Sequence, residues 1–487
     1  MKYFKDVESK RMSIEAVFFD MGGTIDTYYY TRELRIKNVH FLRECLLKAG
    51  IEFVLTNEEL ADAISRGVNT YHKWNRESMI ELTPAEVWSQ FTLKEFKVSR
   101  AQVAPIAEEL TYLYETKFYE RPMRPEIPQV LEKIHAMGLR IGCISNTQSH
   151  TQVPEMMKKH SIYQYFDPII LSCDFGVRKP DASIFYHAAR LAHLPTSSII
   201  YVGDKLTRDI LGAKQAGYRM AVQIKHPYDD GDPDQGPEPD ALIHNMLELL
   251  PLVDREIEKD FSCQNQLNGR HVKALFFDAG DILYYRPIKE QKLKEFLAGK
   301  TLKPNPNLVE EKQRLHNLAY QGELDRLEYY RSVVRLYGIT NEALIEEGAH
   351  AMAEDTDTVA IREGVPETIN ALKQQGYLLG IITDTALPIS TKLNWFEKYG
   401  FGHVWDVVIS SKEMGVRKPS PILYQEALQV CHMDACETAF IGHKAYELEG
   451  ARAVGMKTIA YNFEKESVAD AYIQQFCELL TVPLLKD

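Results

Sequence analysis

The sequence of 487 residues predicts an α/β protein made of two tandem Rossmann-like domains. Each domain is expected to have three layers, with a parallel sheet and a helical cap inserted after the first strand. Three observations predict this class. A set of motifs occurs twice, short apolar runs alternate with amphipathic stretches in each copy, and a long helical stretch follows the first apolar run.

The motifs of the first half return in the second half in the same order. Residues 14–20 read IEAVFFD and residues 272–278 read VKALFFD, while FGVRKPDASIFY at 175–186 returns as MGVRKPSPILY at 414–424. Single positions recur as well: Ser145, Lys179 and Gly203 correspond to Thr383, Lys418 and Gly442, 238 or 239 positions later, and Asp20 corresponds to Asp278, 258 positions later. This spacing is too long for a solenoid repeat, so we expect two tandem domains.

Composition marks the boundary between the two copies. Residues 227–240 are dense in Pro, Gly and Asp and predict an acidic loop. The residues after this loop predict a strand and a helix that still belong to the first copy. The charged and polar stretch at 254–270 is expected to be the linker. We therefore assign the first domain to 1–253 and the second to 271–487.

Apolar runs of the first copy predict the strands of its sheet, at about 15–19, 139–144, 168–171, 199–202 and 219–223. Asp20, Ser145 and Asp204 each lie at or just past the end of one of these runs. Ligands of open α/β sheets bind outside the carboxyl ends of the strands. We therefore expect these three side chains to share one crevice.

A helical stretch with periodic apolar residues predicts a cap at about 28–120, and the second copy is expected to carry its cap at about 286–362. A cluster of aromatic and basic residues opens the first cap: Tyr28, Tyr29, Tyr30, Arg32 and Arg35. Such a cluster either grips an anionic or aromatic substrate or packs the hinge of the cap. The residues alone favour neither interpretation.

Composition argues against several classes of function. The chain has 69 Asp and Glu residues and 57 Lys and Arg residues, and its formal net charge of −12 argues against a broad nucleic-acid surface. No apolar run approaches the roughly 20 residues of a membrane helix, and the charged N-terminus lacks the apolar region of a signal peptide. Seven scattered cysteines without a C-x-x-C pair argue against a disulfide scaffold or a zinc ribbon. We therefore expect a soluble, cytoplasmic protein that binds neither nucleic acid nor membranes.

The residues at the expected crevice have the chemistry of phosphoryl transfer. Asp20 begins the segment DMGGT, in which two glycines let a backbone carbonyl approach an ion closely. Asp204 and Asp209 add carboxylate oxygens, which are the ligands that Mg²⁺ prefers. The remaining groups are uncharged or cationic donors for an anion: Ser145, Asn146 and Lys179.

The motifs D-x-x-x-T, Ser, Lys and GD-x-x-x-x-D, in this order, resemble those of the haloacid dehalogenase-like (HAD) superfamily. The resemblance covers nearly the whole chain, taken twice. It implies that Asp20 is a nucleophile that becomes a phospho-aspartate, with Ser145 and Lys179 as further catalytic residues. A phosphohydrolase with a HAD-like fold is therefore expected.

The resemblance also implies ligands. The Mg²⁺ ligands are expected to be Asp20, the backbone carbonyl of Gly22, Asp204 and Asp209. Contacts to the substrate are expected from Thr24, Asn146 and Arg32. The substrate is expected to be a small phosphorylated metabolite.

The position two residues after Asp20 departs from the family pattern. Phosphatases of the family usually carry a second Asp there as general acid and base, whereas this chain has Gly22. General acid–base catalysis contributes roughly 10²–10⁴-fold, so simple alkyl phosphates should turn over slowly unless Asp26, a cap residue or a good leaving group fills the gap. C–X dehalogenases and phosphonate hydrolases of the superfamily also lack this Asp and remain alternatives. Such dehalogenases need no Mg²⁺, so the pair Asp204 and Asp209 favours phosphorus chemistry.

The second copy has counterparts of the first site at Asp278, Thr383, Lys418 and His443. His443 stands where the first copy has Asp204, and a neutral imidazole is a poor Mg²⁺ ligand but a good transition-metal ligand. We favour a degenerate domain kept for packing or regulation over a site for a different metal, and we expect the halves to pair as a pseudo-dimer. Both copies lack the general acid, so a non-catalytic binding protein is the remaining alternative.

Overall fold

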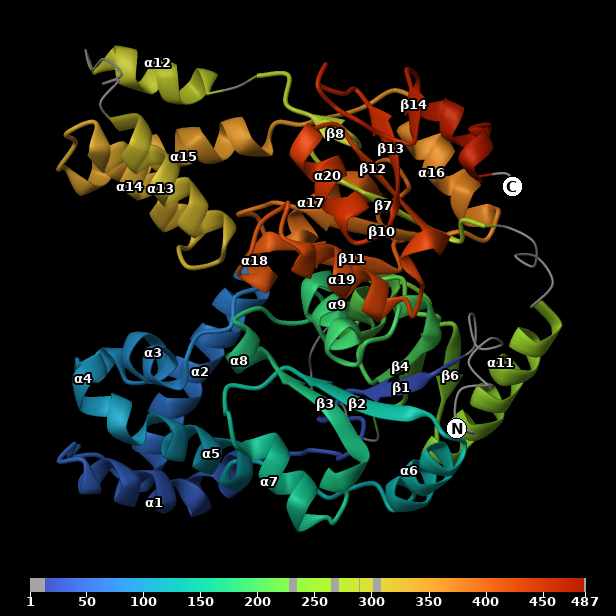
Figure 1. Cartoon of the computed structure of the whole chain (residues 1–487). Helices are drawn as coiled ribbons and strands as arrows, with labels where there is room; N and C mark the ends of the chain where they lie inside the picture. Colours follow the sequence, from blue (N-terminus) through green and yellow to red (C-terminus); the bar gives the residue numbers. More distant parts are fainter. Residues whose placement is uncertain (1–13, 227–233, 264–270, 289, 301–307, 486–487) are drawn as a thin grey trace. The chain divides into compact units, whose positions relative to one another are not determined.

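The computed structural model describes residues 14–226, 234–263, 271–288, 290–300 and 308–485. The chain divides into two compact units, Met1–Cys263 and Gln264–Asp487. Each unit contains one six-stranded sheet with helices around it (Figure 1). The α/β class predicted from the sequence is confirmed.

The sheet of the first unit is parallel throughout, in the order β3-β2-β1-β4-β5-β6. Its strands are β1 (Ala16–Phe19), β2 (Arg140–Ser145), β3 (Phe166–Leu171), β4 (Ile199–Gly203), β5 (Met220–Ile224) and β6 (Ala241–Ile243). Every residue of β1 and β4 is buried, as expected for central strands that are covered on both faces. Each strand predicted from an apolar run is found, and β6 is the strand that returns after the acidic loop.

Helices cover both faces of this sheet, namely α6 (Ile127–Ala136), α7 (Gln152–Lys159), α8 (Ser172–Phe175), α9 (Ala182–Leu191), α10 (Leu211–Gln215) and α11 (Leu249–Cys263). Leu131 of α6 and Val253 of α11 share a core with Val202 of β4. On the opposite face, the ring of Phe185 in α9 lies 5.0 Å from that of Tyr201 in β4. Successive residues of a strand point to opposite faces, so β4 contributes to both layers.

Residues 254–263, which composition assigned to the linker, continue helix α11 instead. Val253 is fully buried, and Nε of Arg219 lies 3.1 Å from Oε2 of Glu256. These contacts hold the helix in place beyond its apolar start, and the charged composition of the segment did not reveal them. Residues 264–270, the rest of the predicted linker, lie outside the described residues.

A helical cap follows β1 and consists of α1 (Arg32–Lys48), α2 (Asn57–Ser78), α3 (Pro84–Val87), α4 (Arg100–Val103) and α5 (Ala107–Lys117), joined by short π- and 3₁₀-helical turns. The chain enters and leaves the cap through an antiparallel bridge between Tyr29 and Glu120. The cap has its own apolar core, which includes Leu42, Ile64 and Trp88. It is therefore packed as a separate layer of the first unit.

The second unit repeats this organisation, with a parallel sheet in the order β11-β10-β7-β12-β13-β14. Its strands are β7 (Ala274–Phe277), β10 (Leu378–Thr383), β11 (Val407–Ser410), β12 (Thr438–Gly442), β13 (Lys457–Tyr461) and β14 (Ala471–Ile473). A two-stranded ribbon of β8 (Tyr284–Tyr285) and β9 (Ala360–Ile361) leads to the second cap, whose helices are α12 (Gln291–Gly299), α13 (Val309–Tyr320), α14 (Arg326–Leu336) and α15 (Glu342–Asp357). The helices around the sheet are α16 (Val365–Gln374), α17 (Ile389–Glu397), α18 (Ser411–Met414), α19 (Pro421–Val430) and α20 (Ala445–Ala453).

In the part of the chain that the structure describes, none of the helices combines the length and the apolar character that crossing a bilayer requires.

Candidate active site

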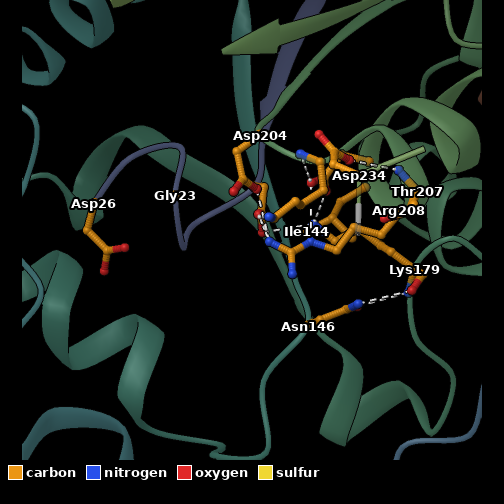
Figure 2. A network of polar contacts seen from close by, with 12 residues as sticks. Gly23, Asp26, Ile144, Asn146, Lys179, Asp204, Thr207, Arg208 and Asp234 are labelled. Carbon is orange, nitrogen blue, oxygen red and sulfur yellow. Dashed lines mark hydrogen bonds and ion pairs between the residues drawn. The ribbon is translucent and has the colours of Figure 1, made fainter. Parts of the chain in front are cut away.

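Side chains from four sequence motifs meet at the carboxyl end of the first sheet. Asp20 follows β1, Ser145 ends β2 and Asp204 follows β4, and these three strands are neighbours in the sheet. Lys179, from the loop before α9, joins them and is 1% exposed. The structure thus brings together the side chains that the strand ends and the motif order predicted, of which Figure 2 labels Lys179 and Asp204.

Lys179 is the centre of a buried ionic cluster. Its Nζ lies 2.8 Å from Oδ1 of Asp20 and 2.6 Å from Oδ1 of Asp209, and it donates a hydrogen bond of 2.8 Å to the hydroxyl of Tyr201. Burial raises the pKa of Asp20 above its ordinary value, and Lys179 acts against this rise. The lysine therefore holds the carboxylate of Asp20 in place and favours its ionised form.

Asn146 positions the loop that carries Lys179. Its Nδ2 donates to the backbone carbonyl of Lys179 at 3.0 Å, and the backbone N–H of Lys179 donates to its Oδ1 at 2.8 Å (Figure 2). Both polar groups of the amide are thus engaged with the backbone of the lysine. Asn146 also lines the cavity described below, as does Ser145.

Asp204 is paired on one side only. Its Oδ1 lies 2.9 Å from Nη2 of Arg208, and the same Nη2 is 3.6 Å from Oδ2 of Asp20. Oδ2 of Asp204 is buried and has no hydrogen-bond partner among the described residues. Burial raises the pKa of Asp204 to about 8, although Arg208 opposes the rise. This oxygen is the acceptor of the site that still needs a partner.

The loop after β1 lies directly against this oxygen. Gly23 has a φ of +86°, and a Cβ at this position would lie 2.3 Å from Oδ2 of Asp204. Only glycine fits both the left-handed backbone and this close approach. The segment after Asp204 is held by Asp234, whose Oδ1 accepts a hydrogen bond of 2.6 Å from the backbone N–H of Leu206.

Asp209 belongs to the cluster, but both of its oxygens are engaged. Oδ1 accepts from Lys179 and Tyr201, and Oδ2 accepts from the backbone N–H of Lys205 at 3.1 Å and from Nε of Arg208 at 3.3 Å. Burial acts to raise the pKa of Asp209, but Lys179 and Arg208 hold it below its ordinary value. Asp209 thus positions the two cations, and it is less suited than Asp204 to be a direct metal ligand.

The donor set fits the hard cation that the sequence predicted. One oxygen from each of Asp20, Asp204 and Asp209 lies within 4.8 Å of the others, and all three residues are buried. The unpartnered Oδ2 of Asp204 is an oxygen donor of the kind that Mg²⁺ takes. The guanidinium of Arg208 is the cation now closest to Asp204 in this cluster.

A cavity of about 820 Å³ opens above this cluster and is lined from both the sheet and the cap. The sheet side contributes Asp20, Gly22, Ser145, Asn146, Lys179 and Arg208, and the cap side contributes Tyr30, Arg35, His72, Arg76, Glu81 and Tyr119. The lining contains more cations than carboxylates. The carboxylates are Asp20, Glu81 and Glu115, and the cations are Arg35, Arg76, Arg121, Arg178, Lys179, Lys205 and Arg208. The cavity therefore suits an anionic ligand.

Besides Arg208, which pairs with Asp20, Asp204 and Asp209, two further arginines are neutralised by carboxylates of the cavity wall. Nη2 of Arg121 lies 2.7 Å from Oε2 of Glu115, and Nη1 of Arg178 lies 3.4 Å from Oε2 of Glu81. Arg35 differs because it makes no ion pair within the described part of the chain. Its charge on the cap side is therefore not neutralised by a carboxylate of the cavity wall.

Arg35, rather than the predicted Arg32, faces the cavity. Arg32 is more than half exposed, and its guanidinium pairs with Asp62 and Glu58 on the outside of the cap, each at 2.6 Å. Three residues on, Nη2 of Arg35 donates to the hydroxyl of Tyr119 at 3.2 Å, and its guanidinium carbon lies 3.9 Å above the ring of Tyr30. The register of α1 decides which arginine turns inward, and the sequence cluster did not reveal it.

Thr24 and Asp26 also lie outside the cavity lining. Thr24 is fully buried, and its Oγ1 has no hydrogen-bond partner among the described residues, so its predicted contact to the substrate is not supported by its position. Asp26 is buried 3.3 Å from Nη1 of Arg121, across the Gly23 loop from Asp204 (Figure 2). Burial raises the pKa of Asp26 to about 6 against the effect of Arg121, yet the carboxyl does not reach the cavity as a replacement general acid.

Several cavity residues were missed by the sequence analysis: His72, Glu81, Arg121, Arg178 and Arg208. A signal existed for two of them, because Arg178 precedes Lys179 in the repeated GVRKP segment and Arg208 lies inside the GD-x-x-x-x-D motif. The cap residues His72 and Glu81 had no local signal. Their place in the lining follows from the packing of α2, which carries His72, and of the segment after it, which carries Glu81, over the crevice.

The counterparts in the second copy also converge, within the second unit. Asp278 follows β7, Thr383 ends β10 and His443 follows β12. Nζ of Lys418 lies 2.6 Å from Oδ1 of Asp278 and 2.8 Å from Oε1 of Glu447, which repeats the clamp formed by Lys179. Glu447, in the first turn of α20, supplies the second carboxylate of this clamp.

Comparison with known proteins gives the same assignment for both halves. Residues 14–217 and residues 300–461 each match a family of haloacid dehalogenase-like hydrolases. The chain is 29% identical over 249 residues to glyceraldehyde 3-phosphate phosphatase of Methanopyrus kandleri, a match that covers 51% of this chain and 100% of that protein. It is 25% identical over 245 residues to N-acylneuraminate-9-phosphatase of Rattus norvegicus, which covers 49% of this chain and 94% of that protein.

Other matches are partial or concern structure. A phosphoglycolate phosphatase of Vibrio parahaemolyticus is 29% identical over 129 residues, 26% of this chain and 55% of that protein. Among solved structures, a HAD phosphatase from Thermococcus onnurineus matches at a TM-score of 0.34 with 24% identity, covering 49% of this chain and 97% of that one. A 2-haloacid dehalogenase from Pseudomonas syringae matches at 0.35 with 21% identity, covering 43% and 97%. The two family matches show that both halves of the chain belong to the haloacid dehalogenase-like hydrolases.

Proposed function

We propose that the first unit is a Mg²⁺-dependent phosphohydrolase that acts through an aspartyl-phosphate on Asp20. The observation that carries this proposal is the buried cluster in which Lys179 clamps Asp20 while one oxygen of Asp204 is left without a partner. Mg²⁺ would be held by Asp20 and Asp204, and it would supply charge neutralisation for the phosphoryl group.

The reaction would proceed in two displacements. A carboxylate oxygen of Asp20 attacks phosphorus, the ester P–O bond breaks, and the leaving alkoxide takes up a proton. Water then attacks the aspartyl-phosphate, which releases phosphate and restores Asp20. Lys179 neutralises charge that develops on the phosphoryl oxygens, and Ser145 at the end of β2 can donate to them.

The substrate is proposed to be a phosphorylated metabolite with an anionic part that reaches the cap. The relatives named above are phosphatases of small phosphorylated compounds. The cavity volume of about 820 Å³ lies within the range of pockets that bind small organic ligands. The guanidinium of Arg35, which lines the cavity and makes no ion pair among the described residues, supports a second negative charge on the substrate. The second copy is proposed to have no part in this hydrolysis.

A screen of phosphorylated metabolites with the purified full-length chain tests the function. We expect phosphate release that depends on Mg²⁺ and stops with EDTA, and inhibition by beryllofluoride, which mimics the phosphoryl group on an aspartate. Chloride release from haloacids without Mg²⁺ would show a dehalogenase instead. No turnover of any substrate and no inhibitor binding would favour a non-catalytic binding protein.

Arg35 is expected to bind the anionic part of the substrate through its unpaired charge. Arg35→Ala should raise KM by roughly 10-fold or more with a smaller effect on kcat, because a charge-assisted contact contributes about 1.5–3 kcal/mol. Arg32→Ala is the matched control, since Arg32 is also in α1 but pairs with Asp62 and Glu58 outside the cavity. Equal effects of the two substitutions would contradict the assignment.

Gly22→Asp is expected to supply the missing general acid. A Cβ at this position would lie 3.5 Å from Nη1 of Arg121 and 3.6 Å from the ring of Tyr28, so the side chain fits. Hydrolysis of an alkyl phosphate should rise more than that of an aryl phosphate, because only the poorer leaving group needs the proton. Kinetics with the two substrates measure this, and equal effects would mean that another group already protonates the leaving oxygen.

A further inference from the structure

The second unit contains a buried cluster with a different set of donor atoms. Asp278 follows β7, His443 follows β12 and Glu447 lies in the first turn of α20. A ligand atom from each residue lies within 4.8 Å of the others, and all three residues are buried. The cluster combines two carboxylates with one imidazole.

Each of the two carboxylates directs one oxygen at Lys418 and the other at His443. Oδ1 of Asp278 and Oε1 of Glu447 pair with Nζ of Lys418 at 2.6 and 2.8 Å. The second oxygens, Oδ2 and Oε2, face Nδ1 of His443 at 3.8 and 3.4 Å. The lysine therefore holds one side of each carboxylate and leaves the other side directed at the imidazole.

His443 has no hydrogen bond to either ring nitrogen among the described residues. Its side chain is 9% exposed, and both nitrogens are completely buried. A buried polar group without a partner destabilises the folded state, so a side chain kept in this position needs a compensating partner. Nδ1 of His443 lies 3.4 Å from Oε2 of Glu447 and 3.8 Å from Oδ2 of Asp278. An ion bound between these atoms would contact the imidazole and both carboxylates.

The exchange of Asp204 for His443 changes the preferred ion rather than removing the site. A carboxylate and a neutral imidazole differ by one negative charge, and imidazole suits Zn²⁺ and similar ions, whereas Mg²⁺ takes oxygen ligands. Space beside the cluster is also kept, because a Cβ added to Gly280 would meet no atom closer than 3.9 Å. A domain preserved only for packing does not account for an imidazole left unsatisfied inside it.

We propose that Asp278, His443 and Glu447 bind a divalent transition-metal ion such as Zn²⁺ in preference to Mg²⁺. The site is separate from the hydrolytic site of the first unit and does not depend on the function proposed for it. The competing arrangement is a protonated His443 that itself serves as the cation among three carboxylates, because Oδ2 of Asp281 lies 4.0 Å from its Nε2. The two arrangements differ in whether a metal ion binds.

The experiment uses the full-length chain with Asp204→Ala and His150→Ala, because Asp204 belongs to the proposed cation site of the first unit and His150 lies with Cys173 and Asp174 in another group of possible metal ligands. Calorimetric titration with Zn²⁺ and metal analysis after dialysis should give one tightly bound ion per chain and no comparable binding of Mg²⁺. Adding His443→Ala should weaken Zn²⁺ binding by at least about tenfold. His403→Ala is the matched control, because His403 belongs to the same unit but is about half exposed and pairs with Glu397. It should leave binding unchanged.

Cobalt substitution identifies the ligand directly. Bound Co²⁺ should show a visible absorption spectrum that changes when His443 is replaced by Ala or by the closer mimic Gln, with circular dichroism unchanged. His443→Asp should lower the preference for Zn²⁺ over Mg²⁺, because it restores an all-oxygen donor set. Absence of Zn²⁺ binding, or binding that is the same with and without His443, would overturn the proposal and leave the protonated imidazole as the explanation.

Discussion

Asp20→Asn is expected to reduce phosphohydrolase activity to the level of a reaction without enzyme, whereas Asp278→Asn should leave at least half of it. The amide of Asn has nearly the shape of the carboxylate but lacks the negative charge that attacks phosphorus and that pairs with Lys179 at 2.8 Å. Asp278 belongs to the other unit, where His443 replaces the second metal carboxylate. Phosphate release with Mg²⁺ under saturating substrate measures both variants.

The pair of variants contains its own control, since each removes one buried carboxylate that is clamped by a lysine. Thermal unfolding of both proteins separates lost chemistry from lost folding. If Asp278→Asn silences the protein and Asp20→Asn does not, the active half is reversed. Inactivity of both variants with intact folding would mean that the two halves act together in the reaction.

Asp204→Ala is expected to abolish the part of the turnover that depends on Mg²⁺ while leaving the fold intact. The reason is that Oδ2 of Asp204 is the buried oxygen of the cluster without a partner, and an alanine provides no ligand in its place. The fold should tolerate the change, because Arg208 keeps Asp209 at 3.3 Å as a counter-charge. A Mg²⁺ activation curve and thermal unfolding measure the two effects.

Asp62→Ala is a suitable control for Asp204→Ala. It also removes a carboxylate that pairs with an arginine, but Asp62 lies in the cap and outside the cavity. It should leave the Mg²⁺ activation curve unchanged. A protein with Asp204→Ala that retains full activity with Mg²⁺ would remove Asp204 from the metal site and point to Asp209 in its place.

Sequence patterns located the sheet and the polar residues at its end, because both depend on local features. The central strands are buried on both faces, so their sequences are continuous apolar runs. In a parallel sheet the residues that bind ligands lie just after the carboxyl ends of the strands. Asp20, Ser145 and Asp204 were found in this way. Lys179 was found by its place in the motif order.

The sequence by itself determined the repeat, the α/β class and four of the side chains that meet at the end of the first sheet, Asp20, Ser145, Lys179 and Asp204. Only the tertiary structure decided how those side chains share their charges, because a charge pairs with whatever packing brings within a few ångströms. In the folded chain Arg35 lines the cavity whereas Arg32 pairs with carboxylates outside it. Both oxygens of Asp209 accept hydrogen bonds, and one oxygen of Asp204 has no hydrogen-bond partner among the described residues. The tertiary structure also left His443 buried against two carboxylates without a hydrogen bond, a property that depends on distances between segments far apart in the chain.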